Sequence, residues 1–374
     1  MKFEKEWQKA KNILCIRLDS IGDVLMTTPA VRALKESLPG RRITLLTSRS
    51  GAGIAPLIPE VDETIPYDAP WMKATRPRVT SDEEFKMINR LYWSGFDAAV
   101  IFTVFSQNPQ PAAFLAYMAE IPLLLGYSRE NPYQLLTNWV PEVDDFGQPD
   151  MRHEVRRQLD LVATIGCHPK DERLSLEVPQ RAVSRVLQML ADMGLNLNRP
   201  WAIMHPGATA PSRCYPPQHF AAAAEQLASD YDIQIVFSGV RTESEIVEEI
   251  RTSMQVNSFS VAGALNIKEF SALVSLAPLL ISNNTGPAHI AAATGTPVVD
   301  LYALTNPQHT PWMVPSRVLY HDVSCKFCYK SVCPMGHHDC LRLVSPGTVV
   351  QAALELLNEA NLMKRQEART LSLT

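Results

Sequence analysis

The chain has 374 residues, of which 46% are hydrophobic and 20% charged, and its formal net charge is −4. This length exceeds what one core ordinarily supports, so we expect two domains. The slightly acidic balance argues against a nucleic-acid partner bound by bulk charge. No apolar run reaches the ~18 residues of a membrane span, and the N-terminus lacks the apolar core of a secretory signal. We therefore expect a cytoplasmic protein whose membrane contact, at the inner face of the cytoplasmic membrane, is peripheral.

The first half alternates strand-like and helix-like segments. Short apolar runs predict strands over 12–18, 42–47 and 97–105, and apolar residues at helical spacing predict a helix over 23–37. Ser81-Asp-Glu-Glu84 resembles a capping box and predicts a helix that ends near Gly95. Apolar runs without strict alternation are typical of parallel strands that are covered on both faces.

The second half repeats this alternation, with strands predicted over 201–205, 233–237, 279–282 and 297–302 and helices over 218–228, 243–254, 267–276 and 287–293. Such alternation predicts βαβ units and parallel sheets, whose ligands lie at the carboxyl ends of the strands. We expect two doubly wound domains, 1–195 and 196–347, that face each other across a cleft containing the active site. A last helix within 348–374 is expected to cross back to the first domain.

The loop after the first strand, Asp19-Ser-Ile-Gly-Asp23, carries two carboxylates. Asp23 lies near a helix N-terminus, where exposed amides stabilise a carboxylate, so one interpretation is a helix cap. The other is a general base at the edge of the sheet, which a reaction at a hydroxyl group needs, and Asp19 is the rival base. The loop lacks the three-glycine spacing of a dinucleotide fingerprint, which argues against a nicotinamide dehydrogenase.

Two loops of the second half have residues suited to a nucleotide. The loop from His205 to Arg213 combines small residues, the Thr209 hydroxyl and a cation that can pair with phosphate. Glu243 follows a predicted strand, where a carboxylate can accept hydrogen bonds from ribose hydroxyls. Each feature alone also fits an ordinary surface loop or a first-turn helix acid.

The segment Asn283-Asn-Thr-Gly-Pro-Ala-His289 is the most informative of this half. Asn284 or Thr285 can cap the helix that follows, and Pro287 fits its first turn. A helix that opens with Thr285 and Gly286 presents free amides suited to a diphosphate. His289 lies one turn further on, and it either packs in the core or hydrogen-bonds the ligand.

Four of the seven cysteines cluster near the C-terminus: Cys325, Cys328, Cys333 and Cys340, with His337 and His338 beside them. The spacing is compatible with a structural four-ligand zinc site. A loop of reduced thiols is the alternative, and a cytoplasmic location disfavours a disulfide.

Together these motifs resemble glycosyltransferase family nine, the lipopolysaccharide heptosyltransferases. The resemblance spans nearly the whole chain. It rests on Arg17-Leu-Asp-Ser-Ile-Gly-Asp23 with Pro29-Ala-Val-Arg-Ala-Leu-Lys35 and Pro39, on His205-Pro-Gly-Ala-Thr209 through Tyr215-Pro216, on Asn284-Thr-Gly-Pro-Ala-His-Ile-Ala-Ala-Ala293, and on Gly295-Thr-Pro297 with Tyr302-Ala-Leu-Thr-Asn-Pro307.

The resemblance implies a GT-B fold of two Rossmann-like domains and an inverting single displacement that needs no cofactor and no metal at the reaction centre. It implies ADP-heptose as the donor, bound by the C-terminal domain, and the inner core of lipopolysaccharide, or a related glycolipid or oligosaccharide, as the acceptor on the N-terminal domain. The family's base falls on Asp23. Its donor-binding positions fall on Thr209, Arg213, Glu243, Asn284, Thr285, Gly286 and His289.

Three positions depart from the family pattern: Arg213 stands where lysine is frequent, Asn284 where aspartate is common, and Ala303 where glycine is frequent. These departures bear on the donor sugar. A loop over 66–81, with Lys73, Arg76 and Arg78 beside Trp71, is basic and aromatic enough to meet a phosphorylated glycolipid, and it also fits an ordinary surface loop. Two rival functions share the architecture: a nucleotide-sugar epimerase, which needs no acceptor, and a non-catalytic sugar-nucleotide-binding protein.

Overall fold

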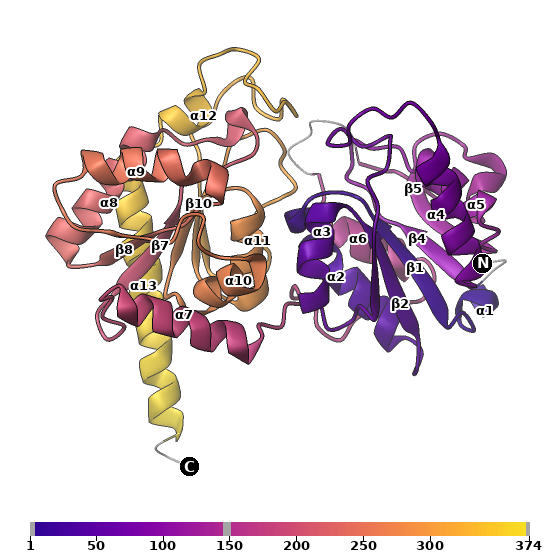
Figure 1. Ribbon diagram of the computed structural model, residues 1–374, viewed down its shortest axis with the longest axis horizontal. Helices are drawn as coiled ribbons and strands as arrows, with labels where there is room; N and C mark the ends of the chain where they lie inside the picture. Colours follow the sequence, from indigo (N-terminus) through magenta and orange to yellow (C-terminus); the bar gives the residue numbers. More distant parts are fainter. Residues whose placement is uncertain (1–3, 145–150, 372–374) are drawn as a thin grey trace. The chain divides into compact units, whose positions relative to one another are not determined.

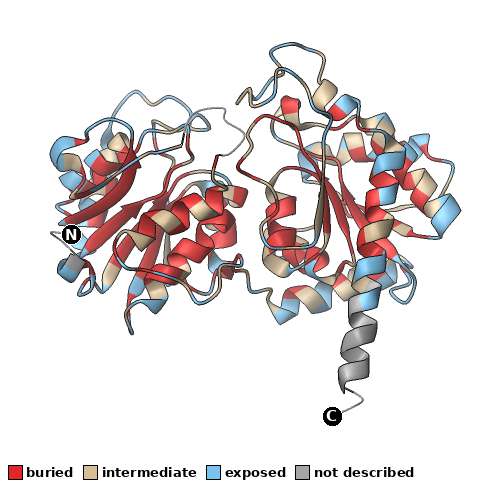
Figure 2. Ribbon diagram, turned by 180° about the vertical axis from the view of Figure 1, so that it is seen from behind, coloured by how far each residue is buried: buried red, intermediate tan, exposed pale blue. Residues whose placement is uncertain are grey.

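The computed structural model describes residues 4–144 and 151–371. The chain divides into two compact units. Unit 1 consists of Met1–Phe146 and Asp150–Glu177, and unit 2 of Gly147–Pro149 and Val178–Thr374. In both units the strands of a central sheet are buried beneath helices on either face (Figure 1, Figure 2).

Unit 1 is built on a six-stranded parallel sheet with the order β3-β2-β1-β4-β5-β6. Its strands are β1 (Asn12–Arg17), β2 (Arg42–Thr47), β3 (Glu63–Pro66), β4 (Ala98–Ile101), β5 (Leu123–Ser128) and β6 (Asn138–Pro141). This strand order is that of a Rossmann fold, in which the order of successive strands reverses between the neighbouring parallel strands β1 and β4. Strands β1 and β2 are buried along nearly their whole length, because helices cover both faces of the sheet.

The helices of unit 1 form two layers. On one face α2 (Ile21–Glu36) packs against α6 (Glu154–Ala163) and α3 (Arg49–Ile54). On the other face α4 (Asp82–Trp93) packs against α5 (Gln110–Met118), and both close an apolar core over β1 and β4. A short helix α1 (Glu4–Trp7) precedes β1.

Unit 2 repeats the same topology, with the strand order β12-β11-β10-β7-β8-β9. Its strands are β7 (Trp201–His205), β8 (Gln234–Phe237), β9 (Phe259–Ser260), β10 (Leu280–Asn283), β11 (Val298–Leu301) and β12 (Ser316–Leu319). All pairings in this sheet are parallel. The loops after β7, β8, β10 and β11 therefore all leave from the carboxyl edge of the sheet, where ligands bind in such folds.

The helices of unit 2 also form two layers. On one face α8 (Pro217–Tyr231) packs against α9 (Ser244–Ser253) and the first half of α13 (Pro346–Leu371). On the other face α10 (Ile267–Leu276) packs against α7 (Gln180–Asp192) and α11 (Gly286–Thr294). A single turn, α12 (Asp339–Arg342), precedes α13.

Most predicted elements are present, and several have the predicted bounds. Strands β2 and β7 and helix α10 coincide with their expected ranges. Helix α4 follows Ser81 as expected, but Ser81 makes no side-chain capping hydrogen bond, so the capping box is not formed there. Short strands such as β3 and β12 were not predicted, because four-residue runs with little apolar character carry no strong period.

The expected boundary near residue 196 lies after α7, a helix that the structure assigns to unit 2, where it packs on α10. The last helix packs on α8 and beside β11 and β12 through its buried residues between Val349 and Leu357. The sequence predicted that this whole helix crosses to the first domain, whereas its described buried side chains pack within unit 2; the side chains of 361 and 363–371 lie outside the described residues. Within the described part of the chain, no helix combines the length and the apolar character that crossing a membrane requires.

Candidate active site

At the carboxyl end of β1, a fully buried arginine lies among three carboxylates. The Arg17 guanidinium is 3.2 Å from Asp19 Oδ2, 3.4 Å from Asp23 Oδ1 and 3.0 Å from Glu154 Oε1. Glu154 begins α6 and is itself fully buried. An arginine at the end of an apolar strand is thus stabilised by acids from the β1–α2 loop and from a helix far along the chain.

The structure shows the capping contacts that the position of Asp23 suggested. Its Oδ2 accepts hydrogen bonds from the Ser20 backbone N–H at 3.1 Å and from the Ser20 hydroxyl at 2.6 Å, which closes the first turn of α2. Its Oδ1 faces Arg17. The side chain keeps 13% of its surface exposed, so it is oriented by these contacts and still open to a ligand.

Asp19, the rival base, is more enclosed than Asp23. Gln107 Nε2 donates to its Oδ1 at 2.5 Å, and 9% of its side chain is exposed. Burial raises the pKa of Asp19 to about 6, although the neighbouring Arg17 charge opposes the shift. A carboxylate with such a pKa can exchange a proton near neutral pH.

In unit 2, the loops that follow β7 and β8 meet at the predicted acid. Glu243 accepts a hydrogen bond from the Val240 N–H at 2.8 Å, and burial raises its pKa. A Cβ on Gly207 would lie 2.1 Å from the Glu243 carboxyl, so only glycine permits this approach. Burial lowers the pKa of the adjacent His205 to about 4, so this histidine is neutral at pH 7 beside Glu243.

The start of α11 has the form that the sequence predicted. Thr285 is the N-cap residue, Gly286 is the first helical residue and Pro287 follows it. The first-turn amides of such a helix have no partner within the helix. His289 is buried, with 4% of its surface exposed.

The Asn284 side chain does not cap α11 but contacts the neighbouring strand instead. Its Nδ2 donates to Asp300 Oδ2 at 2.8 Å and to the His309 carbonyl at 2.9 Å, which ties the end of β10 to β11. Burial raises the pKa of Asp300 to about 8, and the hydrogen bond from Asn284 and the nearby Arg213 charge lower it. Arg213 lies on a short 3₁₀ turn after β7 and is half-buried, whereas Thr209 on the same loop is exposed.

The structure thus brings Arg213, Asn284 and Asp300 together at one edge of the unit 2 sheet, and Glu243 with Gly207 beside β7. Asp23 belongs to unit 1. Sequence reasoning named Asp19 and Asp23 but missed the role of Arg17, Glu154 and Asp300. A charged residue within an apolar strand is the signal that marks Arg17 and Asp300, and Glu154 has none.

A family model described as glycosyltransferase family 9 (heptosyltransferase) matches residues 86–338. The chain belongs to glycosyltransferase family 9. It is 27% identical over 361 residues to lipopolysaccharide heptosyltransferase 2 of Salmonella typhimurium, which covers 93% of this chain and 99% of that protein. It is 26% identical over 306 residues to the lipopolysaccharide core heptosyltransferase OpsX of Haemophilus influenzae, covering 80% of this chain and 81% of that one.

Solved structures confirm the fold of this glycosyltransferase. A glycosyl transferase family 9 protein from Veillonella parvula superposes with a TM-score of 0.77 at 22% identity, over 93% of this chain and 97% of that one. The ADP-heptose lipopolysaccharide heptosyltransferase II of Escherichia coli gives 0.73 at 24% identity, over 94% and 99%. The pair of Rossmann-like units is therefore that of a GT-B glycosyltransferase, as the sequence predicted.

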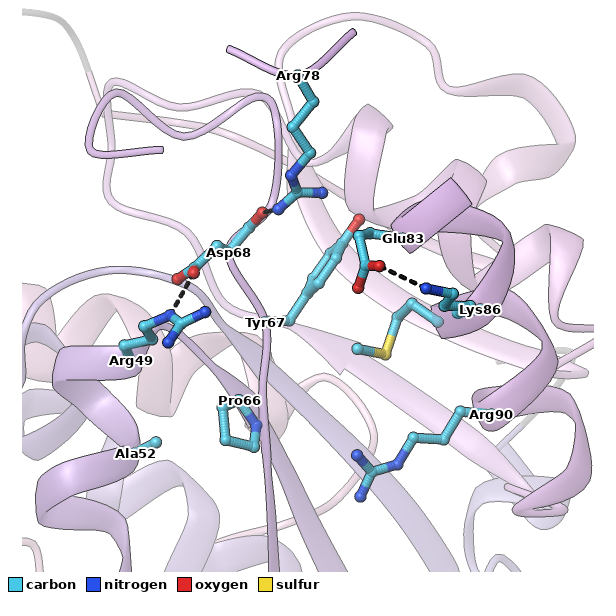
Figure 3. A pocket seen from close by; sticks show the side chains of 10 residues that line it. Arg49, Ala52, Pro66, Tyr67, Asp68, Arg78, Glu83, Lys86 and Arg90 are labelled. Carbon is cyan, nitrogen blue, oxygen red and sulfur yellow. Dashed lines mark hydrogen bonds and ion pairs between the residues drawn. The ribbon is translucent and has the colours of Figure 1, made fainter. Parts of the chain in front are cut away.

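Unit 1 of the glycosyltransferase also contains a cavity of about 780 Å³ beyond the ends of β2 and β3 (Figure 3). Four basic side chains and two acidic ones line it, so the cavity carries a net positive charge. The basic residues are Arg49, Arg78, Lys86 and Arg90, and the acidic ones are Asp68 and Glu83. Figure 3 shows Asp68 between Arg49 and Arg78, and Lys86 paired with Glu83. A second cavity, of about 230 Å³, is lined by Trp71 and Gln107. Because Gln107 donates a hydrogen bond to Asp19, this cavity lies beside the carboxylates of the β1–α2 loop.

The cysteine segment of this glycosyltransferase contacts the loop after β7, because the Ser212 hydroxyl donates to the Lys330 carbonyl at 2.8 Å. Cys325, Cys328, Cys333 and Cys340 line one small cavity with His337 and His338, and all four thiols are free. Burial raises the pKa of the Cys333 thiol, but backbone N–H groups that point to its sulfur outweigh this effect, and its pKa is lowered.

Proposed function

We propose that this glycosyltransferase transfers a heptose from ADP-heptose to a lipopolysaccharide core acceptor, in the cytoplasm and at the inner face of the cytoplasmic membrane. The proposal rests on similarity along 93% of the chain to a lipopolysaccharide heptosyltransferase 2. One observation carries the chemistry: the Arg17-bound pair of aspartates follows β1 of unit 1, while a cationic loop and a helix N-terminus follow β7 and β10 of unit 2.

In this proposal unit 2 binds the donor. Arg213 and the first turn of α11, from Thr285 and Gly286, bind the diphosphate, because both supply positive potential at the same edge of the sheet. Glu243 and Thr209 bind the hydroxyls of the nucleoside, and His289 supports the donor from within α11. Asn284 fixes the end of β10 to Asp300 behind the diphosphate. Since protein groups supply this positive potential, we expect no metal at the reaction centre and no cofactor.

Unit 1 supplies the base. Asp23 takes the proton from an acceptor hydroxyl, and that oxygen forms a bond to the anomeric carbon on the face opposite the diphosphate. The bond from the anomeric carbon to ADP breaks, and ADP leaves with the electron pair. The negative charge that builds on its phosphate is stabilised by Arg213 and α11. Arg17 and Ser20 hold the Asp23 carboxylate in one orientation for this step.

A donor screen with purified protein tests the reaction class and the donor together. Nucleotide release is measured for ADP-heptose and other nucleotide sugars, with and without extracted core glycolipid. Release from ADP-heptose that requires the acceptor supports the proposal. Isomerisation of a donor without acceptor would identify an epimerase, and donor binding without turnover a non-catalytic binding protein.

Two matched variants test which aspartate is the base. Asp23→Asn is expected to lower kcat by about 10²–10⁴-fold while the affinity for ADP is unchanged, because the base acts only on the acceptor. Asp19→Asn keeps the size of the side chain and is expected to cost far less. A reversed order of the two losses would assign the base to Asp19.

The basic cavity of unit 1 fits an acceptor that carries phosphate groups. Arg90 and Lys86 project from α4 toward it, and Arg49 and Arg78 approach it from the other side (Figure 3). Cations of this kind bind phosphate through charge-assisted hydrogen bonds. Lys86→Ala is therefore expected to raise KM for a phosphorylated acceptor and to leave KM for a dephosphorylated one unchanged. Equal effects on both acceptors would contradict this assignment.

An exposed aromatic patch beside this cavity supports peripheral membrane contact. Helices α4 and α5, which pack against each other, expose Phe85, Tyr92, Trp93, Phe114 and Tyr117, and Trp93 is 82% exposed. Aromatic side chains next to cations are typical of surfaces that lie at a membrane interface.

A vesicle assay tests this contact. Trp93→Ser is expected to weaken cosedimentation with vesicles that contain anionic lipid, and Tyr231→Ser, which removes an exposed aromatic from unit 2, is the matched control. Equal cosedimentation of both variants and the unmodified protein would contradict a role for this patch.

A further inference from the structure

The segment between β12 and α12 is folded without a core of its own. Residues 320–338 form no helix or strand, and none of residues 320–340 is buried. Loops of this length without a helix or strand are uncommon in compact domains, and those that are ordered usually have a functional role. Here Phe327, Tyr329 and His338 also adopt left-handed conformations, with φ of 60°, 52° and 54°. Side chains disfavour such a backbone, so contacts with the rest of unit 2 must stabilise it, and the Phe327 and Tyr329 N–H groups donate to the Leu304 and Thr305 carbonyls.

The thiols of this segment gather around one cavity. Cys325, Cys328, Cys333 and Cys340 line the same small cavity, and each is partly covered. His337 and His338 line this cavity as well, so the four sulfurs and the two imidazoles gather around one space. Among the described residues no three of them stand at coordination distance from a common point, so metal binding would draw them inward by side-chain rotation.

Hydrogen-bond donors surround these sulfurs as they surround thiolates. The backbone N–H groups of residues 335–338 point to Cys333 Sγ, and the Leu304 N–H points to Cys340 Sγ. His337 accepts the Asp339 N–H on Nδ1 at 2.9 Å, so its proton lies on Nε2, 3.7 Å from Cys325 Sγ. This tautomer makes His337 a donor to a sulfur and leaves four cysteines as the candidate ligands.

We propose that Cys325, Cys328, Cys333 and Cys340 bind one tetrahedral thiolate-preferring metal ion, Zn²⁺ or iron, and that this site holds the donor loop of unit 2 in place. Four thiolates in a tetrahedron are the ligand set of such metals. On binding, each thiol releases its proton to solvent and its sulfur forms a bond to the metal. The N–H donors around the sulfurs offset the charge of the resulting complex.

The second half of the proposal follows from hydrogen bonds that leave the cysteine segment. Ser212 N–H donates to the Ser331 carbonyl at 3.1 Å, and the Ser212 hydroxyl donates to the Lys330 carbonyl at 2.8 Å. Ser212 immediately precedes Arg213. Phe327 N–H also donates to the Leu304 carbonyl at 2.6 Å, just after β11. A metal that orders residues 325–340 would therefore order the loop that presents Arg213. This part rests on the proposed function, which gives Arg213 its role in donor binding.

Metal analysis of the full chain, purified without a polyhistidine tag, tests the site itself. About one equivalent of zinc or iron per chain is expected. A mercurial reagent should release this metal as it consumes about four thiols, and this measurement requires no variant. Cys328→Ser and Cys340→Ser should lose most of the metal, whereas Cys214→Ser, a partly buried cysteine outside the cluster, should retain it. Metal far below one equivalent, with all cluster thiols reactive or paired in disulfides, would overturn the site.

ADP binding by calorimetry tests the link to the donor loop. Chelator-stripped protein is expected to bind ADP about tenfold more weakly than the metal-loaded protein, and added zinc or iron should restore the affinity, because two hydrogen bonds next to Arg213 lose their fixed acceptors. Unchanged ADP affinity after complete stripping would overturn the positioning role. Stoichiometric metal in a protein that never binds ADP would instead refute the proposed function and leave the metal site standing.

Discussion

Replacing Arg17 by methionine is the most direct way to test what holds the Asp23 carboxylate in place. The side chain is fully buried, and its guanidinium lies 3.0–3.4 Å from oxygens of Asp19, Asp23 and Glu154. Methionine fills much of the same volume without the charge. The variant therefore leaves three carboxylates close together with no cation among them.

The structure sets the size of the effect. Each contact at about 3.2 Å is worth about 5 kcal/mol of Coulomb energy at an effective dielectric constant of about 20. Desolvation of the arginine and repulsion among the acids cancel most of this sum, and broken buried ion pairs typically cost about 3–5 kcal/mol. We therefore expect the unfolding transition of unit 1 to fall by about 10 °C at neutral pH.

Scanning calorimetry as a function of pH tests the electrostatic reason. In the variant, the folded state favours protonated carboxyls, so it binds more protons than the unfolded state and its stability falls as pH rises. The loss relative to the unmodified protein should therefore shrink between about pH 8 and about pH 5.5. Arg42→Met, which breaks an exposed pair with Glu63, is the matched control and should cost less than about 1 kcal/mol. A loss of the same size at both pH values would refute the electrostatic account and leave only packing.

Two further predictions concern unit 2. Gly207→Ala places a methyl group where the Glu243 carboxyl now lies, so ADP affinity should fall by about tenfold while the fold is retained. Gly347→Ala is the control and should bind ADP normally, because its added carbon meets nothing closer than 3.8 Å. Normal ADP binding by both variants would contradict the proposed role of Glu243. Asp300→Asn should raise the stability of unit 2 at pH 8 by about 1 kcal/mol or more. Burial raises the pKa of Asp300 to about 8 in the folded protein, so the folded protein loses stability as pH rises from about 4 to about 8. Calorimetry that finds the same pH dependence in the variant and the unmodified protein would show that Asp300 is not the group responsible.

The sequence was sufficient to predict the fold because its main signals are local. Apolar runs such as 201–205 and helical periods such as 267–276 became β7 and α10 without change. Two parallel sheets with the same strand order follow from the repeated alternation of these elements. The short strands at the sheet edges were missed because edge strands of four residues or fewer have too few buried positions to show a period.

The candidate site was predictable only where its residues lie close together in the sequence. Asp19 and Asp23 lie on one loop, and the structure brings both to Arg17. Glu154 contacts the same arginine although 137 positions of sequence separate the two residues, and no local sequence pattern predicts such a contact. The same limit applies to Glu243 and Gly207, whose close approach depends on how two separate loops leave the sheet.

Asn284 shows how a departure from the family pattern can be compensated by a neighbour. The sequence places an amide where aspartate is common, which removes a negative charge beside the expected diphosphate. The structure shows a carboxyl group immediately behind it, on Asp300, which accepts a hydrogen bond from the Asn284 amide. Because burial raises the pKa of Asp300 to about 8, this carboxyl is largely protonated at pH 7, so the edge of the sheet keeps its hydrogen-bonded pair without the charge. In the proposed reaction, a less negative surface beside Arg213 would favour a doubly charged leaving group, because less repulsion opposes the charge that builds on its phosphates.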